Sequence, residues 1–156
     1  MKQLNYQTLQ DLNYDGYLLN EAPERVLQFG EGNFMRAFVD FFIDKMNETA
    51  NFNSKVVLVQ PIPKFTTPDV GDFINEQEGL YTLYLRGSEN GQEVSSKRVI
   101  SCISRCLNAY SDYEQLWNVQ KIPNCVSSPA IQQKPESYMI RPVSSLILRQ
   151  TVFRQS

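Results

Sequence analysis

The chain has 156 residues, of which 42% are hydrophobic and 21% are charged, values typical of one soluble globular domain rather than of a disordered or fibrous chain. Its net charge of -2 gives no electrostatic reason to expect binding to nucleic acid or to an anionic membrane surface. No apolar run approaches the ~20 residues that span a bilayer, and the N-terminus lacks the pattern of a secretory signal. We therefore expect a cytoplasmic protein.

The residue types that are scarce limit the chemistry. The sequence contains no histidine, which excludes a Ser-His-Asp triad, a Cys-His pair and any histidine-ligated metal within this chain. The three cysteines, Cys102, Cys106 and Cys125, form no C-x-x-C pair. We expect reduced thiols, with no disulfide framework and no metal site.

The first part of the chain has the pattern of a βαβ unit. After a polar lead-in over residues 1–24, the run Val26–Phe29 has the length of a strand. Lys55–Gln60 is a continuous apolar run closed by prolines, which is typical of a strand buried on both faces of a parallel sheet. With the helix predicted over Asn33–Glu48 between them, these runs predict an α/β fold, a partial Rossmann-like doubly wound sheet.

The helix predicted over Asn33–Glu48 has two faces of different character. Its apolar positions recur at helical spacing and form a broad stripe. This stripe consists of Phe34, Phe38, Phe41, Phe42 and Met46, with Met35, Val39 and Ile43 beside them. The polar positions on the opposite face recur every four residues: Arg36, Asp40, Asp44 and Glu48.

The middle of the chain predicts an inserted β-hairpin. Strand-like runs over Leu80–Arg86 and Gln92–Ile103 are joined by Gly87–Gly91, in which Asn90-Gly91 tolerates positive φ. Farther along, Ser111 has the capping-box spacing to Glu114. A second helix is therefore expected over about 112–119, ending before the proline at 123.

The turn between the first strand and the first helix is the candidate binding site. Gly30 and Gly32 leave its backbone free of side chains that would block a phosphate. With Asn33 as the expected N-cap, the free amides of the first helical turn and the helix polarity would bind an anion. These amides are those of Phe34, Met35 and Arg36. The predicted cofactor-binding residues are Phe29, Gly30, Glu31, Gly32, Asn33, Phe34 and Arg36.

The same residues are compatible with two other functions. The glycines alone can make a tight turn, with Arg36 paired to Asp40 on the solvent face. Met35 replaces the third glycine of a G-x-G-x-x-G motif, and Gln60-Pro61 stands where an acidic residue would hold a ribose hydroxyl. A non-catalytic nucleotide- or phosphate-binding module is one alternative, and an interaction protein that uses the aromatic helix Phe34–Phe42 is the other.

Specific stretches resemble the mannitol dehydrogenase family. The turn matches its G-x-G-x-F-x-R pattern at Gly30, Gly32, Phe34 and Arg36, and the likeness runs in order over Pro23–Asn124, through VLVQPI, EGLYTLYLRG and SSKRVISCISR. The resemblance implies that the turn carries the pyrophosphate of NAD. It also implies that the full-length enzyme reduces the ketone of a sugar acid, tagaturonate, to altronate in hexuronate catabolism.

The resemblance implies that the catalytic lysine and the substrate-binding domain lie beyond this chain. We assign no catalytic residue. Lys45, Lys55 and Lys97 are interpreted as solvated charges, and Tyr81 and Tyr84 as residues of the sheet. The isolated chain is expected to be catalytically inactive and to bind NAD weakly.

The resemblance ends near Asn124. The family continues with an R-F-x-x-S-N-T-T-E-A-G-I segment, whereas the chain from Cys125 to Ser156 contains neither glycine nor aspartate. We divide the chain into a lead-in over 1–24, a partial NAD-binding Rossmann-like domain over 25–124 and an aberrant tail over 125–156. This tail is not expected to pack against the preceding sheet.

We predict that the tail is a frameshifted reading of the same gene. When the last base of each codon is joined to the first two bases of the next, the codons from Ala130 to Ser137 allow N-T-T-E-A-G-I in order. Sequencing the coding DNA is expected to show codons that spell this segment in the shifted frame. Codons that cannot spell it would remove the hypothesis.

Overall fold

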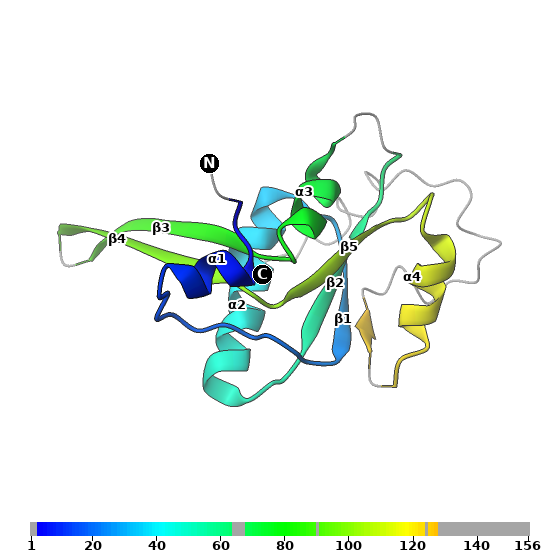
Figure 1. Ribbon diagram of the computed structural model, residues 1–156, viewed down its shortest axis with the longest axis horizontal. Helices are drawn as coiled ribbons and strands as arrows, with labels where there is room; N and C mark the ends of the chain where they lie inside the picture. The colour runs from blue at the N-terminus through cyan, green and yellow to red at the C-terminus, as the bar shows by residue number, and fades with distance from the viewer. Residues whose placement is uncertain (1–2, 64–67, 90, 124, 128–156) are drawn as a thin grey trace, which may run out of the picture.

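The computed structural model describes residues 3–63, 68–89, 91–123 and 125–127, and a parallel sheet lies at its centre (Figure 1). Its strands are β1 (Glu24–Phe29), β2 (Lys55–Gln60), β5 (Ile103–Asn108) and β6 (Val126–Ser127), in the order β5-β2-β1-β6. The chain moves outward from β1 to β5 and then returns to the other side of β1, as in a doubly wound sheet. The predicted α/β, Rossmann-like fold is confirmed.

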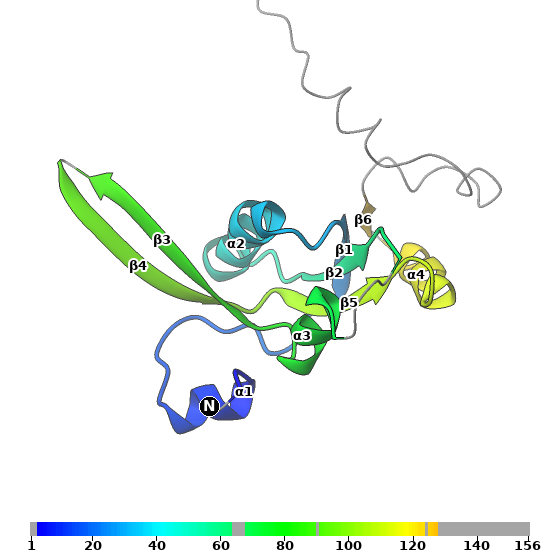
Figure 2. The same cartoon turned by 90° about the horizontal axis from the view of Figure 1, so that it is seen from above.

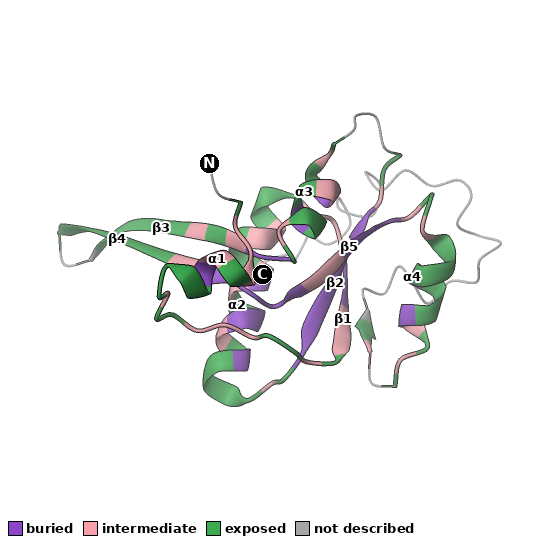
Figure 3. Ribbon diagram, viewed as in Figure 1, coloured by how far each residue is buried: buried purple, intermediate pink, exposed green. Residues whose placement is uncertain are grey.

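Strand β2 is the centre of the hydrophobic core, because all of its residues are buried (Figure 3). Successive side chains of a strand point to opposite faces of the sheet. Val56 and Leu58 pack on the face covered by α2 (Asn33–Ala50) and α3 (Val70–Glu76), whereas Val57 and Val59 pack on the face covered by α4 (Tyr113–Gln120). Figure 2 shows α2 and α4 on opposite sides of the sheet.

The predicted hairpin is confirmed as β3 (Tyr81–Glu89) and β4 (Gln92–Ile100), which form a separate antiparallel pair. It projects away from the parallel sheet in both views (Figures 1 and 2). Gly87 lies within β3, opposite Val94, rather than in the connecting loop. The strand expected to reach Ile103 ends at Ile100, and Ile103 begins β5, which pairs in parallel with β2. Neither glycine nor proline marks this break in the sequence.

The apolar stripe of α2 is divided between core and solvent. Ile43 lies in the core with Val39 and Phe41 packed beside it, whereas Phe34, Phe38, Phe42 and Met46 are between 40% and 74% exposed. Asp40 and Asp44, by contrast, are completely buried, so an exposed pair between Arg36 and Asp40 is wrong. The base of the hairpin packs against this polar face and supplies its hydrogen-bond partners, which makes burial of the carboxyl groups tolerable.

Asp44 joins α2 to the hairpin. One of its carboxylate oxygens accepts from Arg98 Nε at 2.8 Å and from Arg98 Nη2, and the other accepts from Ser101 N at 3.0 Å and Ser101 Oγ at 3.1 Å. Arg98 Nη1 also reaches Glu48 Oε2 at 2.9 Å. The carboxyl group thus accepts four hydrogen bonds, two of them charge-assisted bonds from the Arg98 guanidinium.

The lead-in contains a short helix, α1 (Tyr6–Asp11), which the sequence pattern did not predict. Its Leu9 packs with Leu80 and Val99 at the base of the hairpin. The lead-in is therefore a packed part of the fold.

The predicted second helix is confirmed as α4, but its capping box is wrong. Its N-cap is Asp112, which makes no side-chain cap bond. Asp112 Oδ2 instead accepts from the amide of Asn108 at 2.8 Å. A complete capping box is present at α3, where Asp69 and Asp72 bond reciprocally.

The first residues after Asn124 pack against the sheet, which corrects the expectation for this segment. Val126 and Ser127 form β6 in parallel with Val26 and Leu27 of β1, and Cys125 packs against the α4 side of the core. Residues 128–156, the rest of the predicted tail, lie outside the described residues.

We predict that Arg98→Ala lowers the free energy of unfolding by about 3 kcal/mol, because it leaves the buried Asp44 carboxylate without its cation. Chemical denaturation monitored by circular dichroism measures this change. The matched control is Lys97→Ala on the same strand, an exposed position, where a change within ~0.5 kcal/mol is expected. Equal effects of the two substitutions would contradict the assigned role of Asp44.

Candidate functional site

The predicted binding turn lies at the carboxyl end of β1, where α2 begins. On one side β1 pairs with β2, from which the chain continues outward to β5, and on the other side it pairs with β6. The carboxyl ends of the strands at such a switch in strand order are where open α/β sheets bind ligands. The topology therefore places this turn at the expected ligand edge.

The backbone of the turn is shaped by Gly30. Its φ of +107° belongs to a region that residues with a side chain rarely adopt, and its N–H donates to Val59 O at 2.8 Å. Among the described residues other than the adjoining ones in the chain, none has a heavy atom within 4 Å of a Cβ built on Gly30 or Gly32. The space beside both glycines is open to a ligand.

Helix α2 begins one residue earlier than expected from the sequence. Its N-cap is Gly32, with φ -65° and ψ 158°, and Asn33 is its first residue, so Asn33 is not the N-cap. Arg36 N–H already donates to Gly32 O at 3.1 Å. The amides without a helical acceptor are those of Asn33, Phe34 and Met35. They lie at the start of an 18-residue helix, whose polarity favours an anion there.

Arg36 is held beside the turn by two contacts. Its Nη2 donates to Asn33 Oδ1 at 2.5 Å, and its guanidinium lies over the Tyr81 ring, 5.6 Å from the centroid. Its buried Nε has no hydrogen-bond partner among the described residues. The positive charge of Arg36 therefore stands next to the turn, with its Nε buried and unpartnered within the ranges that the structure describes.

A second group of polar residues, not predicted as part of the site, lies beneath the turn. Tyr81 Oη is 2.7 Å from Arg36 O and 3.2 Å from Asp40 Oδ2. Gln28 Nε2 donates to Gly30 O at 3.3 Å. In the described part of the chain, Gln28 Oε1 and Asp40 Oδ1 have no hydrogen-bond partner. The spacing of Arg36 and Asp40, one helical turn apart, was the one sequence signal for this group.

The other predicted site residues lie around the glycine turn. Phe29 ends β1 and packs on the α4 side of the core, whereas Phe34 is 74% exposed. Glu31 is half-buried between the two glycines, where its charge opposes an anionic ligand. At the end of β2, Gln60 Oε1 accepts a hydrogen bond from Asn108 Nδ2 at 3.0 Å. This oxygen is therefore already hydrogen-bonded within the protein.

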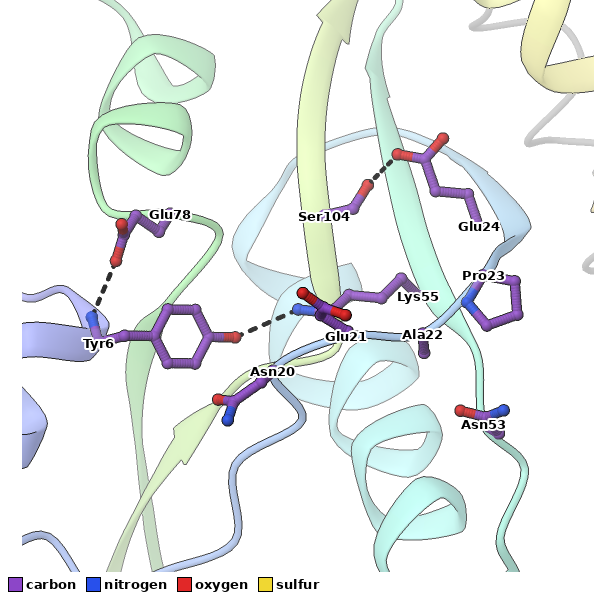
Figure 4. A pocket seen from close by; sticks show the side chains of 10 residues that line it. All are labelled: Tyr6, Asn20, Glu21, Ala22, Pro23, Glu24, Asn53, Lys55, Glu78 and Ser104. Atoms are coloured by element: carbon purple, nitrogen blue, oxygen red, sulfur yellow. Dashed lines mark hydrogen bonds between the residues drawn. The ribbon is translucent and has the colours of Figure 1, made fainter.

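An open cavity of about 700 Å³ lies at the opposite edge of the sheet (Figure 4). It is lined by the first residues of two strands, Glu24 and Lys55, together with Ser104 near the start of β5. Lys55 is only 6% exposed and donates to Tyr6 Oη at 3.2 Å and to Ser101 O at 3.0 Å, so its interpretation as a solvated charge is wrong. Burial lowers the pKa of this lysine. The cavity is far from the ligand edge in topology, and it is separate from the turn.

Metal and thiol chemistry gain no support from the geometry. The described residues contain no cluster of three or more His, Cys, Asp or Glu side chains that could hold a metal ion. Burial raises the pKa of the Cys102 and Cys106 thiols, which keeps them protonated and unreactive.

Within the residues that the structure describes, no helix is both long and apolar enough to cross a bilayer.

Known proteins share this sequence and fold. The family profile of the mannitol dehydrogenase Rossmann domain matches residues 24–137, past the point at which the resemblance was expected to end. The altronate oxidoreductase of Phocaeicola vulgatus is 46% identical over 72% of this chain and 22% of its own length. That of Halalkalibacterium halodurans is 40% identical over 80% of this chain and 24% of its own length.

Two solved structures have the same arrangement of elements. A substrate-free D-sorbitol dehydrogenase superposes with a TM-score of 0.63 at 21% identity, over 78% of this chain and 25% of its own. Mannitol 2-dehydrogenase of Pseudomonas fluorescens, in a ternary complex with NAD and D-mannitol, superposes with a TM-score of 0.58 at 26% identity. The match covers 75% of this chain and 24% of that enzyme. This chain thus spans about a quarter of the length of the relatives that it matches. It belongs to the mannitol dehydrogenase family.

Proposed function

We propose that this chain is the cofactor-binding N-terminal part of an NAD-dependent oxidoreductase that acts on a sugar acid. The observation that carries the proposal is the open turn at Gly30 and Gly32, followed by the free amides of Asn33, Phe34 and Met35 at the ligand edge of the sheet. Relatives named altronate oxidoreductase, and a structural neighbour that holds NAD, support this function. Reduction of tagaturonate to altronate in hexuronate catabolism, in the cytoplasm, is the specific reaction that we infer.

The residues present fit the diphosphate of the cofactor. Side chains at Gly30 and Gly32 would fill the space that two phosphate groups need, and three free amides offer neutral donors without the desolvation cost of a buried charge. Arg36 adds a charged donor from the first helical turn, while Glu31 limits the affinity by its like charge.

The chain's own residues bind and orient the cofactor rather than carry out the reaction. Bound NAD would supply hydride transfer. Lys45 is half-buried on α2 and pairs with Glu48 at 2.8 Å, while Lys55 lies at the opposite edge of the sheet, so neither serves as the proton donor to a substrate ketone. We therefore infer that this chain alone is inactive and that further parts of a full-length enzyme supply the substrate site.

We predict that Gly32→Val lowers the affinity for NADH by about tenfold or more, ~1.4 kcal/mol. The backbone of Gly32, at φ -65° and ψ 158°, accepts any residue, and the added atoms meet no neighbour within 4 Å among the described residues. The fold therefore tolerates the change while the side chain occupies the phosphate space. Isothermal titration calorimetry with NADH, ADP-ribose and inorganic phosphate measures the effect.

The matched control is Gly87→Val in the projecting hairpin, where an added Cβ also has open space. Its NADH affinity should equal that of the wild type. Equal affinities for all three proteins would contradict binding at the turn. Binding of phosphate without binding of NADH would favour the alternative of a non-catalytic phosphate-binding module.

A further inference from the structure

Asp40 is a buried carboxyl group directly beneath the candidate turn. It is completely buried and lies one helical turn after Arg36. Its Oδ2 is 3.2 Å from the hydroxyl of Tyr81, whose oxygen is also 2.7 Å from the main-chain carbonyl of Arg36. Its Oδ1 has no hydrogen-bond partner among the described residues.

The protons in this cluster can be counted. The Tyr81 hydroxyl has one proton, and the shorter of its two contacts is to a carbonyl, which only accepts. If the hydroxyl donates its proton to Arg36 O, only a lone pair of Tyr81 Oη remains to face Asp40 Oδ2. The contact between these two oxygens is then a hydrogen bond only if the carboxyl group supplies the proton. The geometry is therefore that of a neutral acid that donates to the tyrosine oxygen.

Asp44 provides the contrast within the same helix. It is buried to the same extent as Asp40, but its two oxygens accept four hydrogen bonds from Arg98 and Ser101. The donors that would stabilise an ionised carboxylate are thus concentrated at Asp44. At Asp40 the donors within reach are the Tyr81 hydroxyl and the Gln28 amide, and each of them also donates to a main-chain carbonyl.

We propose that Asp40 is a protonated positioning residue, and that its ionisation as the pH rises through neutrality weakens dinucleotide binding at the adjoining turn. The effect on binding rests on the proposed function, whereas the protonation of Asp40 does not.

The charged and titratable groups around Asp40 support this assignment. Burial, with a smaller effect of Asp44, raises the pKa of Asp40 to about 7, against the opposing effects of the Tyr81 hydroxyl, the Gln28 amide and the Arg36 charge. The thiol of Cys102, which donates to Asp40 O at 3.3 Å, stays protonated because its own pKa is raised by burial. Asp40 is therefore the group in this cluster that titrates near neutral pH.

Ionisation of Asp40 changes the field at the turn. A new negative charge one helical turn from Arg36 attracts its guanidinium and opposes a diphosphate at the amides of Asn33, Phe34 and Met35. Binding and protonation are linked reciprocally. A bound diphosphate therefore raises the pKa of Asp40, and the free energy of that shift equals the free energy by which ionisation of Asp40 weakens binding. The diphosphate of NADH does not itself ionise between pH 6 and 8.5. A change in NADH affinity over this range therefore comes from groups of the protein.

The protonation state is tested first without any ligand. In the full chain labelled with ¹³C at the aspartate carboxyl groups, the assigned Asp40 signal is expected to titrate near pH 7. An Asp40 signal that is already that of a carboxylate at pH 5.5 overturns the proposal, whether or not the chain binds NADH.

Stability supplies a second readout that needs no ligand. The folded-state pKa of Asp40 lies above its unfolded value, so its contribution to stability is complete below about pH 4 and is lost as the pH rises through 7. Relative to Asp40→Asn, in which the amide mimics the neutral acid, the wild-type unfolding constant should rise roughly a hundred- to thousandfold between pH 4 and pH 8. A constant ratio would overturn the proposal.

The effect on binding is measured by NADH titration at pH 6 and pH 8.5. The wild-type dissociation constant is expected to rise roughly tenfold, whereas that of Asp40→Asn stays constant. The control Glu48→Gln removes an exposed carboxylate two turns farther along α2 and should keep the wild-type profile. Parallel profiles for wild type and Asp40→Asn would overturn the link to binding, and failure of all three proteins to bind NADH would instead refute the proposed function.

Discussion

The parallel pairing of β1 with β2 on one side and with β6 on the other is the constraint on which the rest of the structure depends. It fixes the carboxyl end of β1 at the point where the strand order switches. The hydrogen bond from Gly30 N–H to Val59 O continues this pairing into the turn, and the positive φ of Gly30 then directs the chain into α2. The free amides that suit a diphosphate follow from this geometry.

Helix α2 carries its polar residues inward because the hairpin supplies partners for them. Asp44 accepts hydrogen bonds from Arg98 and Ser101 and ties the hairpin to the helix, whereas Asp40 lies beneath the turn beside the Tyr81 hydroxyl and the Gln28 amide. Two equally buried carboxyl groups, one helical turn apart, thus differ in the donors around them. Asp44 anchors the hairpin to the helix, and the proposed ionisation of Asp40 changes the charge next to the turn.

The sequence predicted the elements better than it predicted their contacts. The buried run of β2, the glycine turn and the helix after it are local patterns with periods that identify them, and all were found. The burial of Asp40 and Asp44 depends on Tyr81, Arg98 and Ser101, which are distant in sequence, so no local pattern could reveal it. The start of β5 at Ile103 was missed for a related reason, because only pairing with β2 separates it from the hairpin.

Binding of the cofactor at the glycine turn is tested most directly by ¹H–¹⁵N spectra of the full chain during titration with NADH. The largest amide shifts are expected over residues 30–35, at the carboxyl edge of the sheet. Shifts confined to the opposite edge, around the cavity at Glu24, Lys55 and Ser104, would contradict it.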